Sequence, residues 1–137
     1  MHLIALKLQT KRKGSNSKLE NKEFAEQLEN RTKNFRVRII GLSQTLPDTP
    51  EGRVVRNQIT KCGTSIGANY REANRARSRA DFRNRIAICE SEASETKYWL
   101  EIIAEVKWLA QEELRADSDE CCELLAIFTS IGRKFAR

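Results

Sequence analysis

Breaks in helical patterning are scarce in this sequence, and that scarcity limits the folds open to it. Both prolines lie in the segment LPDTPEG (46–52), and apolar residues recur at three- and four-residue steps from residue 18 onward. Such spacing is typical of amphipathic helices, whereas the alternation typical of strands is almost absent. We therefore predict an all-α protein whose first helix ends at Pro47.

Capping residues predict where the helices begin. The candidates are Ser17 with Glu20, Thr49 with Pro50, Ser78 with Asp81, and Asp117 with Glu120. A side-chain oxygen at a helix start accepts a hydrogen bond from an otherwise unpaired backbone N–H. An acidic side chain three residues later accepts a hydrogen bond from the backbone N–H of the cap residue itself. Proline fits the first helical position, where no N–H donor is needed.

Each predicted helix has a stripe of inward-facing positions. They are Phe24, Leu28, Phe35, Ile39, Leu42 and Leu46 in the first helix; Val55, Ile59, Cys62, Ile66, Asn69 and Ala73 in the second; Phe82, Ile86, Cys89, Ala93, Thr96, Leu100 and Ile103 in the third; and Leu124, Leu125, Phe128, Ile131 and Phe135 in the fourth. Four helices with short joins predict an antiparallel up-down-up-down four-helix bundle over residues 17–137.

Residues 1–16 are expected to form a flexible basic leader. Their apolar run, MHLIALKL, is short, is broken by Lys7, and is followed by KRKGSNSK instead of a small-residue cleavage site. No stretch of the chain approaches the ~20 apolar residues of a membrane span. The four cysteines suit reduced thiols, so we expect a cytoplasmic protein.

The third predicted helix has a second apolar stripe beside its seam, formed by Trp99, Ile102, Val106 and Leu109. One apolar face is enough for a small bundle, so the extra width indicates a further contact. We expect these four residues to form part of an interface between copies of the chain.

Basic residues gather at the predicted corner between the second and third helices. Residues 1–85 carry 19 Lys and Arg against 8 Asp and Glu, whereas residues 86–123 carry 3 against 11. Such a cluster is the electrostatic footprint of a protein that binds nucleic acid through phosphates. The residues expected to bind are Arg71, Arg75, Arg77, Arg79, Arg83 and Arg85, with Tyr70 as an aromatic contact.

The same arginines have a structural interpretation, as a solvated face or as partners of a helix dipole. It suits Arg75 and Arg77, which would lie at a helix C-terminus. It does not suit Arg79 and Arg83, because the first turns of the next helix disfavour a cation. Other cations that could extend the patch are Arg36, Arg38, Arg53, Arg56 and Lys61.

Gly63 and Gly67 lie within the second predicted helix, where each costs about 1 kcal/mol relative to alanine. A phosphate-binding loop would need glycines before a helix start, and this segment is mid-helix. We therefore expect a close approach of two helices at this pair, with a backbone contact to a ligand as the less favoured alternative.

Residue types for catalysis or metal binding are missing from the pattern. Glu72, Glu92 and Glu95 raise the question of a carboxylate metal centre, but the only histidine is His2, in the leader. The same shortage argues against triad and zinc-protease chemistry. The four cysteines are expected to be reduced, partly buried thiols, since neither their spacing nor the adjacent Cys121–Cys122 pair suits a metal site or an ordinary disulfide.

Four segments carry a resemblance to a known family: RVRIIGLSQTLP (36–47), GTSIGANYREA (63–73), RARSRADF (75–82) and ETKYWLE (95–101). The chain resembles bacterial four-helix bundle proteins encoded in intervening sequences of large-subunit ribosomal RNA genes. Accessory variability proteins of diversity-generating retroelements are related to them. The resemblance implies a bundle commonly assembled as a homopentameric ring, without recognised catalytic activity. It also implies, for retroelement members, assistance to a reverse transcriptase and nucleic-acid binding through basic surfaces.

We expect a non-enzymatic, oligomeric protein that binds the backbone of RNA or DNA and needs no cofactor or metal. A reverse transcriptase would be a further partner if the chain acts as the retroelement members do. The alternative is a scaffold subunit whose arginines dock onto acidic protein surfaces, among them its own residues 112–123. Binding to a polyanion distinguishes the two functions.

Overall fold

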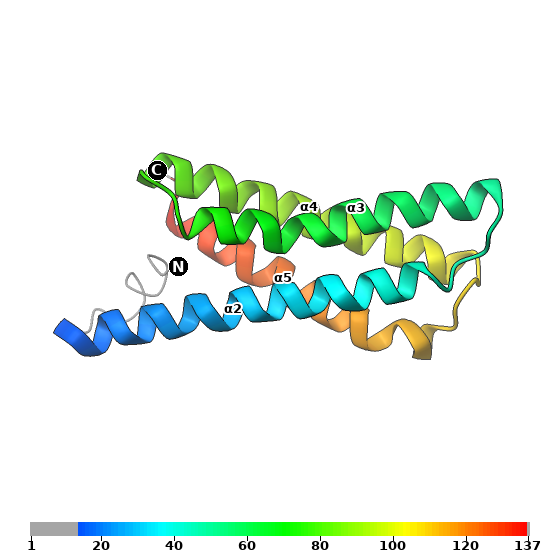
Figure 1. Ribbon diagram of the computed structural model, residues 1–137, viewed down its shortest axis with the longest axis horizontal. Helices are drawn as coiled ribbons and strands as arrows, with labels where there is room; N and C mark the ends of the chain where they lie inside the picture. Colours follow the sequence, from blue (N-terminus) through cyan, green and yellow to red (C-terminus); the bar gives the residue numbers. More distant parts are fainter. Residues whose placement is uncertain (1–13, 137) are drawn as a thin grey trace.

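Four helices form a bundle in the computed structural model, which describes residues 14–136 (Figure 1). They are α2 (Gly14–Ser43), α3 (Pro50–Ala73), α4 (Arg79–Glu105) and α5 (Gln111–Lys134). Each helix runs opposite to the one before it, which confirms the predicted antiparallel up-down-up-down bundle. Within residues 14–136 there is no strand, and none of these helices has the apolar length that a bilayer crossing needs.

Two helix starts follow the sequence prediction. Thr49 caps α3 by accepting, at Oγ1, a 3.0 Å hydrogen bond from the backbone N–H of Gly52, and Pro50 is the first helical residue. Ser78 caps α4 in the same way, accepting a 3.0 Å bond from the N–H of Asp81. Because each cap satisfies an N–H that the helix leaves unpaired, local chemistry fixes both joins.

The first helix is longer than predicted at its N-terminus. α2 begins at Gly14, three residues before Ser17, and so includes residues 14–16 of the expected leader. Residues 1–13 of that leader lie outside the described residues.

The last helix also begins earlier than predicted. α5 starts at Gln111 and not after Asp117. Its first turn is held by Glu113, whose carboxylate accepts a 2.8 Å bond from the backbone N–H of Ala110. The cap residue is alanine, which has no side-chain acceptor, so the sequence carries only half of the usual start signal.

The third helix ends earlier than predicted. α4 stops at Glu105, although the apolar stripe suggested continuation to Leu109. Lys107 has a φ of 63°, in the left-handed region, and the N–H of Trp108 reaches back 3.2 Å to the carbonyl of Ile103. This Schellman arrangement pairs the last carbonyls of a helix and usually places glycine at the left-handed position. A lysine there conceals the helix end from sequence inspection.

The predicted seams form the core. All seven positions predicted for the third helix, from Phe82 to Ile103, are buried in α4. In α3, however, Tyr70 takes the inward position that was predicted for Asn69, which is half-buried. The ring of Tyr70 packs edge-on against Phe128 of α5, with centroids 5.5 Å apart, and so connects two helices across the core.

α2 and α3 approach closely where α3 lacks side chains. A Cβ at Gly63 would lie 2.8 Å from Cγ2 of Ile39, and one at Gly67 would lie 3.0 Å from Oγ1 of Thr32. Real Cβ atoms almost never come as near to another atom as the Gly63 contact would require, so a larger residue there must displace Ile39 or the helix that carries it. The contact at Gly67 is tight, and a larger residue there would require Thr32 to move by a few tenths of an ångström. The predicted close contact at both glycines is confirmed, and it offsets their low helix propensity.

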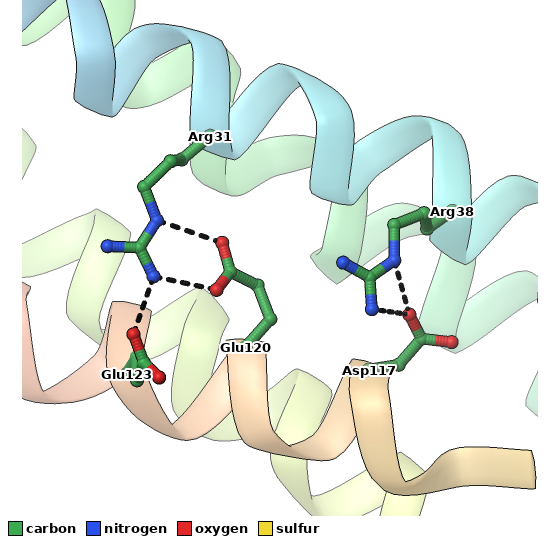
Figure 2. A network of polar contacts seen from close by, with 5 residues as sticks. All are labelled: Arg31, Arg38, Asp117, Glu120 and Glu123. Atoms are coloured by element: carbon green, nitrogen blue, oxygen red, sulfur yellow. Dashed lines mark hydrogen bonds and ion pairs between the residues drawn. The ribbon is translucent and has the colours of Figure 1, made fainter.

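Ion pairs join α2 to α5, whose contact is the smallest among neighbouring helices (Figure 2). Arg31 donates to the two carboxylate oxygens of Glu120 at 2.6 and 3.0 Å and to Glu123 at 2.9 Å. The bond to Glu120 raises the pKa of Arg31. Arg38 binds Asp117 at 2.6 Å. Asp117 and Glu120, predicted to start a helix, thus connect α5 to α2.

Gly63→Leu is expected to lower the free energy of unfolding. Helix propensity alone favours leucine by about 1 kcal/mol. Forcing a bulky side chain into the space of Ile39 should outweigh this gain and leave a net loss of roughly 1–3 kcal/mol. Urea unfolding at a fixed protein concentration measures the change.

Gly41→Leu is the matched control for this variant. Gly41 lies in α2 with nothing within 4 Å of its Cβ position, so leucine there should raise the free energy of unfolding by up to about 1 kcal/mol. If the Gly63 variant gained as much stability as the Gly41 variant, a tight contact at Gly63 would be ruled out.

Arg31→Gln should lower the free energy of unfolding by about 1–2 kcal/mol, because it leaves the carboxylate of Glu120 without its charge-assisted bonds. Glu120 is only 19% exposed in this pair. The control is Arg53→Gln, since Arg53 and Asp48 are 53% and 78% exposed and such pairs contribute about 0–1 kcal/mol. Equal losses in the two variants, again by urea unfolding, would contradict a stabilising role for the α2–α5 pair.

Candidate nucleic-acid interface

The six arginines lie around the join of α3 and α4, residues 74–78, at one end of the bundle. Their exposure divides them into two groups. Arg71, Arg75, Arg77 and Arg79 are exposed, whereas Arg83 and Arg85 are partly buried. The exposed group is accessible to a ligand. Whether each arginine is already bound within the protein depends on its neighbours.

Arg79 and Arg83 contact the C-terminal end of α5. The Cζ atom of Arg79 lies 4.5 Å from the ring centroid of Phe135, and its Nη2 is 3.5 Å from the carbonyl oxygen of Lys134. Arg83 donates to the carbonyl of Phe135 at 3.4 Å. Carbonyls at a helix end carry partial negative charge, which favours nearby cations.

The prediction that no helix dipole accounts for Arg79 and Arg83 is therefore wrong. It considered only the helix that contains them, α4, whose first turn disfavours cations. In an antiparallel bundle that first turn lies beside the last turn of α5, and the neighbouring dipole has the opposite sign. Nucleic-acid binding by these two arginines stays a prediction beside this structural contact.

Arg85 and Tyr70 are less available than predicted. Arg85 donates to Oδ1 of Asn69 at 3.3 Å, which links α4 to α3. Tyr70 is 0% exposed, and its burial raises the pKa of its hydroxyl. The prediction that Tyr70 contacts nucleic acid is wrong, because the side chain lies in the core instead of beside Arg71 at the surface.

Arg71 and Arg75 line a groove between α2 and α3. The groove has a volume of about 680 Å³, and Lys33 and Arg36 of α2 line it as well. None of these four cations forms an ion pair with another described residue. Four unpaired cations around one hollow favour an anionic ligand with its charge spread over several groups.

Two carboxylates also line the groove, and their surroundings differ. Glu29 accepts a 2.7 Å bond from Nδ2 of Asn74. Glu72 lines the groove and is exposed. The lining therefore carries two more positive than negative side chains, and one of the two carboxylates already has a donor.

Of the cations that could extend the patch, Arg36 alone reaches this groove. Arg38 is paired with Asp117, and Arg53 with Asp48. Arg56 donates to the carbonyl of Leu46 at 2.8 Å. Lys33 was not predicted at all. Its spacing of three residues from Arg36 was visible in the sequence, but the position of α2 against α3 was not.

The predicted oligomer stripe is only partly one surface. Trp99 and Ile102 lie half-buried on α4, and Val106, the C-cap, is 49% exposed. Leu109 follows the left-handed turn, so the prediction that it lies on the same helical stripe is wrong. Tyr98, at 52% exposure, is a further apolar side chain on this helix.

The thiols and remaining carboxylates have mostly structural positions. Burial raises the pKa of Cys62 to about 11 and the pKa values of Cys89 and Cys121 to about 12, so these thiols resist ionisation. Cys122 is free and exposed. Burial also raises the pKa of Glu92. Among residues 14–136, His, Cys, Asp and Glu side chains do not gather in threes as metal ligands do.

Comparisons with known proteins agree with this fold. Residues 25–130 match the family model described as 23S rRNA-intervening sequence protein. A crystal structure from Bacteroides thetaiotaomicron, of a protein with unknown function from the S23 ribosomal protein family, is 37% identical. That match covers 77% of this chain and 97% of the other, with a TM-score of 0.72. Comparison with curated proteins gives no match. On the family match, this chain belongs to the 23S rRNA-intervening sequence protein family.

Proposed function

We propose that this protein binds RNA or DNA through backbone phosphates and catalyses no reaction. The observation that carries the proposal is a set of four cations along the α2–α3 groove that form no ion pair within residues 14–136: Lys33, Arg36, Arg71 and Arg75. Exposed Arg77 extends this set at the corner. Cations without carboxylate partners gain most from a polyanion, because phosphate binding releases counterions without breaking an existing ion pair.

The alternative function, a scaffold that docks its arginines onto acidic segments such as residues 112–123, has less support. Three of the acids in that segment, Asp117, Glu120 and Glu123, bind Arg38 and Arg31 of the same chain. Their charge is therefore largely neutralised before a second copy arrives. A nucleic acid has no such internal partner for its phosphates.

The proposed assembly is a closed ring, with five copies as in the family resemblance. Trp99 and Ile102 on α4 and Val106 at its C-cap offer apolar surface, and Val54 is 56% exposed at the N-terminal end of the adjacent α3. Covering such surface by a second copy would remove it from water. A ring would also present several corners to one strand, which raises the effective concentration of binding sites.

Light scattering at micromolar concentration should give a mass close to five times the 15.8 kDa of one chain. Val106→Asp should shift the protein towards smaller species, because a charge in a covered apolar contact is costly. Val37→Asp is the control, since Val37 is 61% exposed on α2 and lies outside the proposed contact. A parent protein that scatters as a monomer would refute the ring.

Replacing Arg71, Arg75 and Arg77 together with Gln should weaken binding to RNA and DNA of unrelated sequence alike. Each phosphate neutralised contributes about −0.7 to −0.9 to the slope of log affinity against log salt. Loss of three contacts should therefore flatten the slope by about 2–3 units, which a fluorescence-anisotropy titration across a salt series measures. Arg79 and Arg83 are left intact because they hold the end of α5.

A control variant removes the same charge elsewhere. Lys97, Lys107 and Arg115 are exposed on α4, the following join and α5. Their joint replacement with Gln should leave the salt slope nearly unchanged. Equal effects of the two triple variants would indicate a response to net charge alone, and absence of binding by the parent at low salt would favour the scaffold function.

A further inference from the structure

The groove between α2 and α3 lies at the surface beside the point where small residues let the two helices approach closely. Gly67 and Thr32 lie where the helices meet, and Ala68 lines the groove beside them. Helices in contact have axes about 8–10 Å apart, and contact through glycine favours the short end of this range. Side chains from the two helices therefore face each other across a hollow much narrower than a nucleic-acid duplex.

Cations line the groove on both of its sides. Lys33 and Arg36 lie on α2, and Arg71 and Arg75 lie on α3. The lining on α2 runs from Glu29 to Arg36, which at 1.5 Å per residue is roughly 11 Å. A phosphodiester chain that lies in the groove can thus contact cations on both sides over a few nucleotides. A duplex would meet only those arginines whose ends stand at the rim.

The polar lining also indicates a ligand with donors besides its phosphates. Asn30 and Glu72 line the groove, and neither forms a hydrogen bond through its side chain to another described residue. A carboxylate repels phosphate, but it accepts hydrogen bonds from amino groups on base edges or from a ribose hydroxyl. In a duplex the base edges are paired and stacked, whereas in a single strand they are free to reach these side chains.

We propose that the α2–α3 groove holds a single-stranded segment of RNA or DNA, and that the protein prefers single strands to duplexes of the same sequence. The proposal rests on the proposed nucleic-acid function and specifies the form of ligand that its cations recognise. Phosphates provide attraction along both walls, and Asn30 and Glu72 contact the unpaired nucleotide edges.

The test compares a short single-stranded RNA, a single-stranded DNA and the matching duplexes by fluorescence anisotropy at low salt. Single strands should bind about tenfold more tightly. Ala68→Leu then fills the groove without changing its charge, and should weaken single-strand binding to the level of the duplex while duplex affinity stays the same. Ala87→Leu, at an exposed alanine of α4, is the matched control and should keep the preference.

A second pair of variants distinguishes binding within the groove from binding at the exposed join of α3 and α4. Arg36→Gln should weaken single-strand binding alone, whereas Arg77→Gln at the exposed join should weaken single-strand and duplex binding alike. Equal affinity of the parent for single strands and duplexes, with no effect of Ala68→Leu, would overturn the groove proposal and leave phosphate binding at the corner intact. Absence of binding to every probe by the parent would overturn both proposals.

Discussion

The close approach of α2 to α3 is the contact from which the other features of the bundle follow. Gly63 and Gly67 leave room for Ile39 and Thr32: a Cβ would collide with Ile39 at Gly63 and would be in tight contact with Thr32 at Gly67. This fit fixes the separation and the register of the two helices. Because the register is fixed, Lys33 and Arg36 of α2 lie opposite Arg71 and Arg75 of α3, and the two pairs share one groove.

The arginines at the α3–α4 join show that the electrostatic effect of helix ends on a charged side chain depends on neighbouring helices as well as on its own helix. Arg79 and Arg83 lie in the first turns of α4, where their own helix disfavours positive charge. The antiparallel arrangement places them against the last carbonyls of α5, and Phe135 contacts both Arg79 and the ring of Phe82, whose centroid is 5.0 Å away. The two arginines thus bind the end of α5 to the start of α4.

The sequence predicted those parts of the fold that depend on local chemistry. The seam of α4 and the caps at Thr49 and Ser78 were predicted residue by residue, because periodicity and capping are properties of one segment. The turn at Lys107 and the alanine cap of α5 were missed, since neither residue is the type that usually occupies its position. Tyr70 was misassigned because Asn69 and Tyr70 both fit the helical spacing, and only packing against Phe128 decides between them.

The candidate site was only half predictable for a different reason. Charge is visible in a sequence, but whether a cation is already neutralised depends on the helix beside it. On α2, Arg31 and Arg38 face α5 and are bound by carboxylates, whereas Lys33 and Arg36 face α3 and form no ion pair with a carboxylate of the described residues. Salt therefore acts on both sides of this helix, screening the ion pairs that hold it to α5 as well as any phosphate in the groove. Residue type alone therefore does not tell which lysines and arginines form structural ion pairs and which remain accessible to a ligand. The packing of the helices decides this.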